Sequence, residues 1–160
     1  MTNNIPDNFV YFGLFILDKD KEILKNFIAD KFGKEFGKRI VELDTKIYLE
    51  HCTVFHKNDK HQFPFKIQMY NYLNNIFEEY PGMIYRLRVV GYGYNEYAFA
   101  LKVELPDGIP YFMYKVYHIT VCTFHRAKPV ESNNIINWYN LNAPINVYCQ
   151  LKKVIRDENI

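Results

Sequence analysis

Residues 117–123 read Tyr-His-Ile-Thr-Val-Cys-Thr, and within them His118-Ile119-Thr120-Val121 repeats a pattern found earlier in the chain. The earlier copy is His51-Cys52-Thr53-Val54, and the two histidines are 118 − 51 = 67 residues apart. Five His and five Thr among 160 residues give roughly 0.16 His-x-Thr matches by chance. Two matches, each followed by Val, therefore indicate a shared role, and their separation favours one strand in each half of a single domain.

Strand geometry gives this spacing a chemical meaning. Side chains alternate between the two faces of a strand, so His118 and Thr120 share one face while Ile119 and Val121 share the other. The first copy behaves in the same way. Each strand thus presents an apolar face to a core and a His/Thr pair to the opposite side. Two such strands facing each other would place two imidazoles and two hydroxyls around one small anion.

Composition limits the classes of protein that the chain can belong to. A hydrophobic content of 49% in 160 residues is ample for the core of one domain. The formal net charge of +2 argues against extensive binding to duplex DNA, although it is compatible with a small anionic ligand. No run of about 18 apolar residues predicts a membrane span, and the amino terminus does not resemble a signal peptide. Three Cys without a Cys-x-x-Cys pair favour a reducing, intracellular and cytoplasmic location.

The first half of the chain predicts strands alternating with helices. The first apolar run predicts a central strand, and the helical spacing of the apolar residues after it predicts a helix. Two glycines then indicate a loop, which precedes a short strand and the first motif strand. The expected elements are a strand at 9–17, a helix at 21–32, a loop at Gly33 and Gly37, a short strand at 40–43, and a strand at 46–56.

The second half predicts one more long helix and then mostly strands. The helix should end at Pro81-Gly82, and alternating residues around Asn95 predict a hairpin. The expected elements are a helix at 65–80, hairpin strands at 83–94 and 96–105, the second motif strand, a short helix from Ser132 or Asn133 to Trp138, and a last strand at 145–155. This order predicts an α+β domain with two small antiparallel sheets facing a central groove and with the helices outside.

The two motifs and the order of elements resemble the two-histidine (LigT-like) phosphoesterase superfamily, whose members carry two His-x-Thr/Ser motifs on strands that line a groove. The resemblance implies that residues 1–160 form a single two-histidine phosphoesterase domain. The second motif, followed by Lys128-Pro129-Val130-Glu131-Ser132-Asn133, also resembles the cyclic phosphodiesterase domain of fungal tRNA ligases and related stand-alone viral and phage enzymes. The chain differs from the tRNA ligases in having no ligase or kinase domain, so tRNA end-healing within one chain is not expected.

The resemblance assigns roles to particular residues. It makes His51 and His118 the catalytic acid/base pair and Thr53 and Thr120 the hydroxyls that bind nonbridging phosphate oxygens, and it implies no metal and no cofactor. It also places Lys128 near the mouth of the groove. Because nucleobases stack on aromatic rings, Tyr11, Tyr92 and Tyr94 are further candidates for substrate binding.

The expected activity is that of a metal-independent phosphodiesterase acting on cyclic or 2'-linked nucleotides. By resemblance, these include immune messengers such as cyclic GMP-AMP or 2'-5' oligoadenylate, whose hydrolysis would evade host nucleotide signalling. One alternative is an RNA 2',3'-cyclic phosphate phosphodiesterase in RNA end repair, and another is a non-catalytic module that sequesters nucleotides. The expected partners are therefore cyclic nucleotides, oligonucleotides or RNA ends, and the sequence identifies no protein partner.

Other chemistry-bearing residues support weaker hypotheses. His51, Cys52, His56 and His61 are metal-ligand types, but their spacing matches no familiar zinc pattern. On unbroken strands, His56 and His125 would point away from the catalytic face. Cys122 would share the face of His118 and would be available as a nucleophile, although the paired histidines make one unnecessary.

Overall fold

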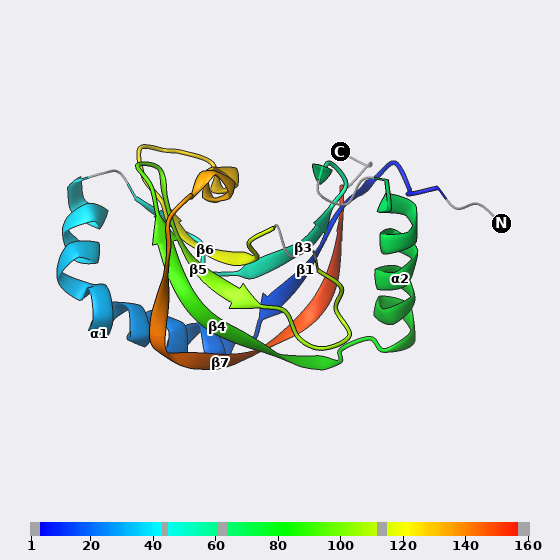
Figure 1. The fold of residues 1–160 in the computed structure, drawn as a ribbon, viewed down its shortest axis with the longest axis horizontal. Helices are drawn as coiled ribbons and strands as arrows, with labels where there is room; N and C mark the ends of the chain where they lie inside the picture. The colour runs from blue at the N-terminus through cyan, green and yellow to red at the C-terminus, as the bar shows by residue number, and fades with distance from the viewer. Residues whose placement is uncertain (1–3, 43–44, 61–63, 112–114, 157–160) are drawn as a thin grey trace.

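The computed structural model describes residues 4–42, 45–60, 64–111 and 115–156, with the backbone alone for 35–42. Figure 1 shows strongly bent strands with one helix at each end of the sheet. In chain order the elements are β1 (Phe9–Ile16), α1 (Asp18–Glu42), β2 (Lys46–Ile47), β3 (His51–His56), α2 (Lys66–Glu79), β4 (Ile84–Tyr94), β5 (Ala98–Glu104), β6 (His118–Thr123), the 3-10 helix η2 (Pro129–Asn134) and β7 (Trp138–Ile155).

The strands form one continuous antiparallel sheet that closes on itself. Their order is β2-β6-β3-β1-β7-β4-β5, and β5 also pairs with β6, so six strands complete a ring to which β2 adds as an extra strand. The expected fold of two small sheets facing a central groove with helices outside is therefore wrong. The strands do not divide into two sheets because the long strands β4 and β7, of 11 and 18 residues, pair with each other and connect β5 to β1 in one sheet.

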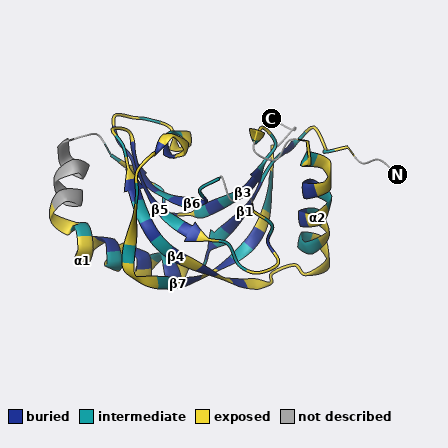
Figure 2. Cartoon of the chain, viewed as in Figure 1, coloured by how far each residue is buried: buried dark blue, intermediate teal, exposed yellow. Residues whose placement is uncertain are grey.

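Alternation along the strands separates a core face from a second, more accessible face (Figure 2). In β6, for example, Ile119 and Val121 are buried while His118 and Thr120 are partly exposed. The core face packs against Leu24 of α1 and Leu73 of α2, which belong to the same hydrophobic cluster as the strand residues. Packing of this kind fixes the strand register, because a slip of one residue would move every apolar side chain out of the core.

Several expected boundaries agree with the structure. The strand at 9–17 corresponds to β1, the helix at 65–80 to α2, and the hairpin to β4 and β5. The side chain of Asn95 closes the hairpin turn by accepting hydrogen bonds from the backbone N–H groups of Tyr97 and Ala98 at 2.8 and 2.9 Å. Gly82 follows α2 with a φ of 77°, a conformation that favours glycine.

Other expected boundaries are wrong. Gly33 and Gly37 lie inside α1, which continues to Glu42 where a loop and a short strand were expected. The neighbouring Lys, Glu and Arg residues are good helix formers, and each glycine weakens a helix by only about 1 kcal/mol. The expected strand at 46–56 is divided into β2 and β3, with Leu49 between them at a φ of 55°. The expected helix ending at Trp138 is instead η2, and Trp138 begins β7.

Among the residues that the structure describes, no helix is both long and apolar enough to cross a bilayer.

Candidate functional site

The two motif strands are neighbours in the ring, and their pairing brings the motifs together. Cys52 of β3 is the cross-strand partner of Ile119 of β6, and both side chains are fully buried. In each strand, the residues directly before and after this pair project from the opposite face of the sheet. His51, Thr53, His118 and Thr120 therefore surround this pair on one face, where all four are partly exposed.

His118 has a fixed orientation. Its Nδ1 lies 3.2 Å from the carbonyl oxygen of Val116, and because a carbonyl can only accept, Nδ1–H is the donor and Nε2 keeps its lone pair. Burial lowers the pKa of His118 to about 4; the bond to Val116 opposes this shift, while Lys115 and His51 add to it. A neutral imidazole with a free Nε2 is the form that accepts a proton.

His51 has a different environment. Its ring stacks against those of Phe15 and Tyr11, with centroids 4.7 and 5.1 Å away. Its Nδ1 is buried without a hydrogen-bond partner among the described residues. Burial lowers the pKa of His51, and the neighbouring carboxylate of Glu50 partly opposes that shift. The charge of His51 also contributes to the lowered pKa of His118, although less than burial and the charge of Lys115 do.

The hydroxyl of Thr120 is held by a residue that follows the second motif. Thr120 Oγ1 lies 2.9 Å from Oγ of Ser132, a buried residue of η2. If Ser132 donates this bond, the hydroxyl proton of Thr120 remains available for an anion. The Asn95 side chain donates to the carbonyl oxygen of Glu131 at 3.3 Å, so the hairpin turn supports η2. The sequence pattern did not predict this role of Ser132, because its contact with Thr120 depends on tertiary structure.

Four further side chains lie on the face of the two histidines, and sequence analysis did not assign them to the site. Phe15 is the cross-strand partner of His51, and Lys102 is the partner of His118. Lys152 is paired with Gly13, which in turn is paired with Thr53. The ring of Trp138 lies 5.9 Å from that of His118. Only the strand pairings, which no local pattern specifies, bring these residues to the motifs.

The structure brings one of the candidate substrate-binding residues to the site and places two others away from it. Tyr11 stacks on His51. Tyr92 stacks on the core residue Phe99, and Tyr94 is the cross-strand partner of Phe99, so both project from the face opposite to the histidines. Lys128 is exposed at the start of η2, the segment that carries Ser132.

A bulge changes the position of His56. Gly13 pairs with Thr53 but Phe12 pairs with Phe55, so β3 has one extra residue there and its alternation reverses. The ring of His56 consequently stacks on Tyr11, with centroids 6.3 Å apart, and the expectation that it points away from the catalytic face is wrong. Burial and the nearby lysines, Lys57 first among them, lower the pKa of His56.

Neither the metal nor the cysteine hypothesis gains support from the described residues. They contain no group of three or more His, Cys, Asp or Glu side chains arranged to hold a metal ion, and His61 lies outside them. All three cysteines are free and buried. Burial raises the pKa of Cys52 to about 12, so its thiol stays protonated. Cys122 is fully buried in the core cluster, and His125 lies in the exposed turn after β6.

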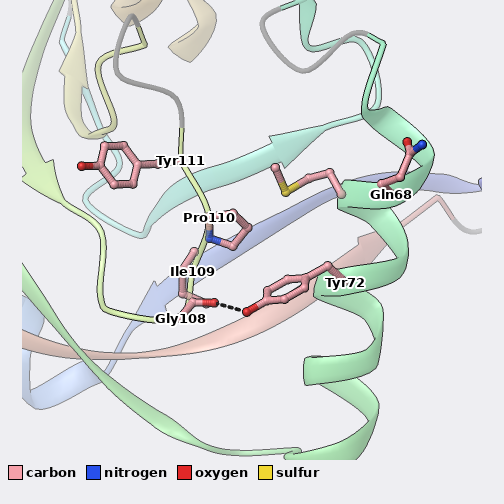
Figure 3. Close-up of a pocket in the computed structure, with 7 residues that line it drawn as sticks. Gln68, Tyr72, Gly108, Ile109, Pro110 and Tyr111 are labelled. Carbon is pink, nitrogen blue, oxygen red and sulfur yellow. Dashed lines mark hydrogen bonds between the residues drawn. The ribbon is translucent and has the colours of Figure 1, made fainter.

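A separate pocket of about 550 Å³ lies between α2 and the connection from β5 to β6 (Figure 3). Tyr72 of α2 points toward residues 108–111, and its hydroxyl donates to the carbonyl oxygen of Gly108 at 3.0 Å; Gln68 also lines the pocket. Its lining contains no acid, base or nucleophile with the reactivity that the motif histidines provide.

Comparisons with known proteins establish the fold. No family model matches the chain, and no curated protein matches its sequence. Its structure is similar to a crystal structure described as that of a fungal RNA kinase, with a TM-score of 0.58 and 15% sequence identity over 92% of this chain. The match covers 46% of the kinase chain, so this chain spans about half of that protein's length. At this identity, the similarity shows a shared fold.

Proposed function

We propose that the chain is a metal-independent phosphodiesterase of the two-histidine class that hydrolyses cyclic or 2'-linked nucleotides. The observation that carries the proposal is the pairing of Cys52 with Ile119, which presents both His-x-Thr motifs on one face of the sheet. Two imidazoles on one face, each accompanied by a threonine, would supply an acid, a base and two donors. Immune messengers such as cyclic GMP-AMP or 2'-5' oligoadenylate are the substrates we propose first.

His118 is the general base in this mechanism. Its Nε2 accepts a proton from water, or from the ribose hydroxyl next to the phosphodiester, while its Nδ1–H remains bonded to Val116. The resulting oxygen nucleophile forms a bond to phosphorus as the bond to the leaving oxygen breaks. The lowered pKa keeps the base unprotonated at neutral pH, although it also makes the imidazole a weaker base.

His51 is the general acid, which protonates the leaving oxygen. Burial disfavours its charged form in the free protein. A phosphodiester anion beside the ring favours the imidazolium, because opposite charges within a few ångströms stabilise each other. Substrate binding therefore supplies the condition in which His51 carries the proton to be donated.

The two threonines stabilise the charge that develops on the nonbridging oxygens. Thr120 is positioned for this by Ser132, which leaves its hydroxyl proton free when Ser132 is the donor. Donors that are already oriented cost no reorganisation in the transition state, and each is typically worth about 3 kcal/mol. Thr53 offers the equivalent hydroxyl from β3.

A second candidate function is the opening of RNA 2',3'-cyclic phosphate ends. The observation that favours it is the fold shared with part of a protein described as an RNA kinase, an enzyme whose name identifies RNA as its substrate. The same four residues would serve this reaction, in which water attacks the cyclic phosphate. The two functions therefore differ in substrate and not in catalytic groups.

Product analysis with chelator present tests the proposal. The substrates are 2',3'-cyclic AMP, a 2'-5' oligoadenylate, mixed-linkage cyclic GMP-AMP and its all-3'-5' isomer. We expect cleavage of a 2'-linked or cyclic dinucleotide, with loss of turnover in both His51→Gln and His118→Gln. Cleavage of the cyclic mononucleotide alone would select RNA end processing. Tight binding without turnover would instead identify a sequestering module and contradict the catalytic proposal.

A further inference from the structure

A row of cross-strand pairs connects Thr120 of the second motif to Trp138 of β7. On the side of β6, Thr120 pairs with Ala100, Ala100 with Gly93, and Gly93 with Trp138. The indole lies directly over Gly93, where an added Cβ would be only 2.6 Å from Trp138 Cε3. Because Gly93 and Ala100 are small, Trp138 can pack against the sheet, with its ring centroid 5.9 Å from that of His118.

An aromatic surface also borders the other histidine. Phe15 is the cross-strand partner of His51, and the two rings stack at 4.7 Å with an interplanar angle of 25°. Tyr11 extends this surface, since its ring is nearly parallel to that of Phe15 at 6.3 Å. Glycine at position 13 leaves room for both rings, because a Cβ there would be 3.0 Å from Tyr11 Cε2 and 3.2 Å from Phe15 Cε1. Each motif histidine therefore has its own aromatic neighbour.

Cations accompany the aromatic residues on both sides of the motifs. Lys102, on β5, is the partner of His118. On the other side, Lys152 reaches over the ring of Phe15, with Nζ 5.4 Å from the centroid, and only Gly13 separates its backbone from that of Thr53. Neither lysine has a carboxylate partner among the ion pairs of the described residues. Positive charge is thus available on both flanks of the four motif side chains.

We propose that the site takes a substrate with a nucleoside on each side of the scissile phosphate, stacking one base near Trp138 and the other near Phe15. The inference rests on the proposed function and specifies its substrate class as dinucleotide or longer. Aromatic rings bind nucleobases through their faces, and lysines attract the flanking phosphates. A cyclic mononucleotide has one base and would use one of the two surfaces.

Tryptophan fluorescence tests binding independently of catalysis, because Trp138 is the single Trp of the chain. The probes are 2'-5' and 3'-5' diadenosine monophosphates with the hydroxyl next to the phosphate replaced by hydrogen, compared with AMP. We expect one of the dinucleotides to quench Trp138 and to bind at least roughly tenfold more tightly than AMP, as expected for a second base–aromatic stack. Phe15→Ala should remove most of that advantage.

Tyr139→Ala is the matched control for this binding experiment. Tyr139 follows Trp138 on β7 but pairs with Tyr92 on the opposite face, so its loss should leave dinucleotide affinity unchanged. Equal affinities for AMP and both dinucleotides, or a dinucleotide advantage that survives Phe15→Ala, would overturn the inference.

Turnover separates failure of the inference from failure of the proposed function. Trp138→Ala should lower kcat/KM for diadenosine monophosphate by roughly tenfold, mainly through KM, and Trp138→Phe should restore most of it. If the motif-histidine variants lose turnover but the unsubstituted protein shows no preference for substrates with two bases, only this inference is rejected. Turnover that survives both histidine substitutions would reject the proposed function, while the fluorescence titration would still decide whether two bases bind.

Discussion

His51 and His118 occupy the same position in two copies of one motif, yet the fold gives them different surroundings. His118 is oriented through Nδ1 by the carbonyl of Val116, and burial lowers its pKa to about 4. His51 has no hydrogen-bond partner for Nδ1 among the described residues and is held by stacking on Phe15 and Tyr11. A repeated sequence motif therefore does not imply a repeated chemical role. In our proposal, the oriented ring is the base and the stacked ring is the acid.

The largest expected effect is the loss of either histidine. His51→Gln and His118→Gln should each lower kcat by roughly 10²- to 10⁴-fold, the range typical of general acid or base catalysis. Steady-state kinetics would measure these losses, and His125→Gln, which changes a histidine in the exposed turn after β6, is the matched control. Nearly full activity in one of the two motif variants would contradict the division into acid and base.

Removal of either threonine hydroxyl should cause the next largest loss of kcat. Thr53→Val and Thr120→Val keep the shape of the side chain but remove the hydroxyl, and each should lower kcat by roughly 100-fold, as for other donors to a developing charge. Comparing kcat with KM for the two variants shows whether the bonds act in the transition state. An effect confined to KM would assign the hydroxyls to substrate binding alone.

Substitution of Ser132 should have a smaller effect on kcat than loss of a threonine hydroxyl, and it should act through Thr120 and not through Thr53. Ser132→Ala removes the hydrogen bond that orients Thr120 and should lower kcat by about tenfold, the scale of one neutral hydrogen bond. A double-mutant cycle is the sharper measurement. Adding Ser132→Ala to Thr120→Val should cause little further loss, whereas adding it to Thr53→Val should cause its full effect. Equal coupling to both threonines would show that Ser132 acts on the fold in general.

The smallest effect concerns the pH dependence of stability. The pKa of His118 is about 4 in the folded protein, against 6.5 for an unperturbed histidine, so the unfolded chain binds more protons between these pH values. The free energy of unfolding should therefore rise with pH across this range, and His118→Gln should remove part of the slope. Urea unfolding from pH 4 to 7 would measure it. An unchanged slope in the variant would contradict the lowered pKa.

The arrangement of side chains on the motif strands could be predicted from the sequence because strand alternation is a local property. The pattern predicted that His118 and Thr120 share a face, and β1, α2 and the hairpin lie close to where they were expected, whereas the first motif strand is divided into β2 and β3. These elements have strong apolar periodicity and clear turn residues. The signals that locate a single strand or helix are contained within its own residues.

Several of the errors arose where pairing between distant strands decides the structure. The closed ring depends on the pairing of β5 with β6, and the position of His56 depends on a bulge in β3; neither has a local sequence signature. Lys102, Lys152 and Trp138 were missed for the same reason, because their strands reach the motifs only in the folded ring. The motif pattern therefore located the proposed catalytic groups, while the fold located their neighbours.

The pH profile of kcat/KM, measured in chelator with a 2'-5' dinucleotide, tests the proposed roles of the two histidines most directly. Activity should rise as the base loses its proton near pH 4 and fall as the acid loses its proton below pH 6.5, because burial lowers both pKa values. The residual activity of His118→Gln should lack the acidic limb, and that of His51→Gln should lack the basic limb. Loss of the same limb in both variants, or abolition of activity by chelator, would contradict the account.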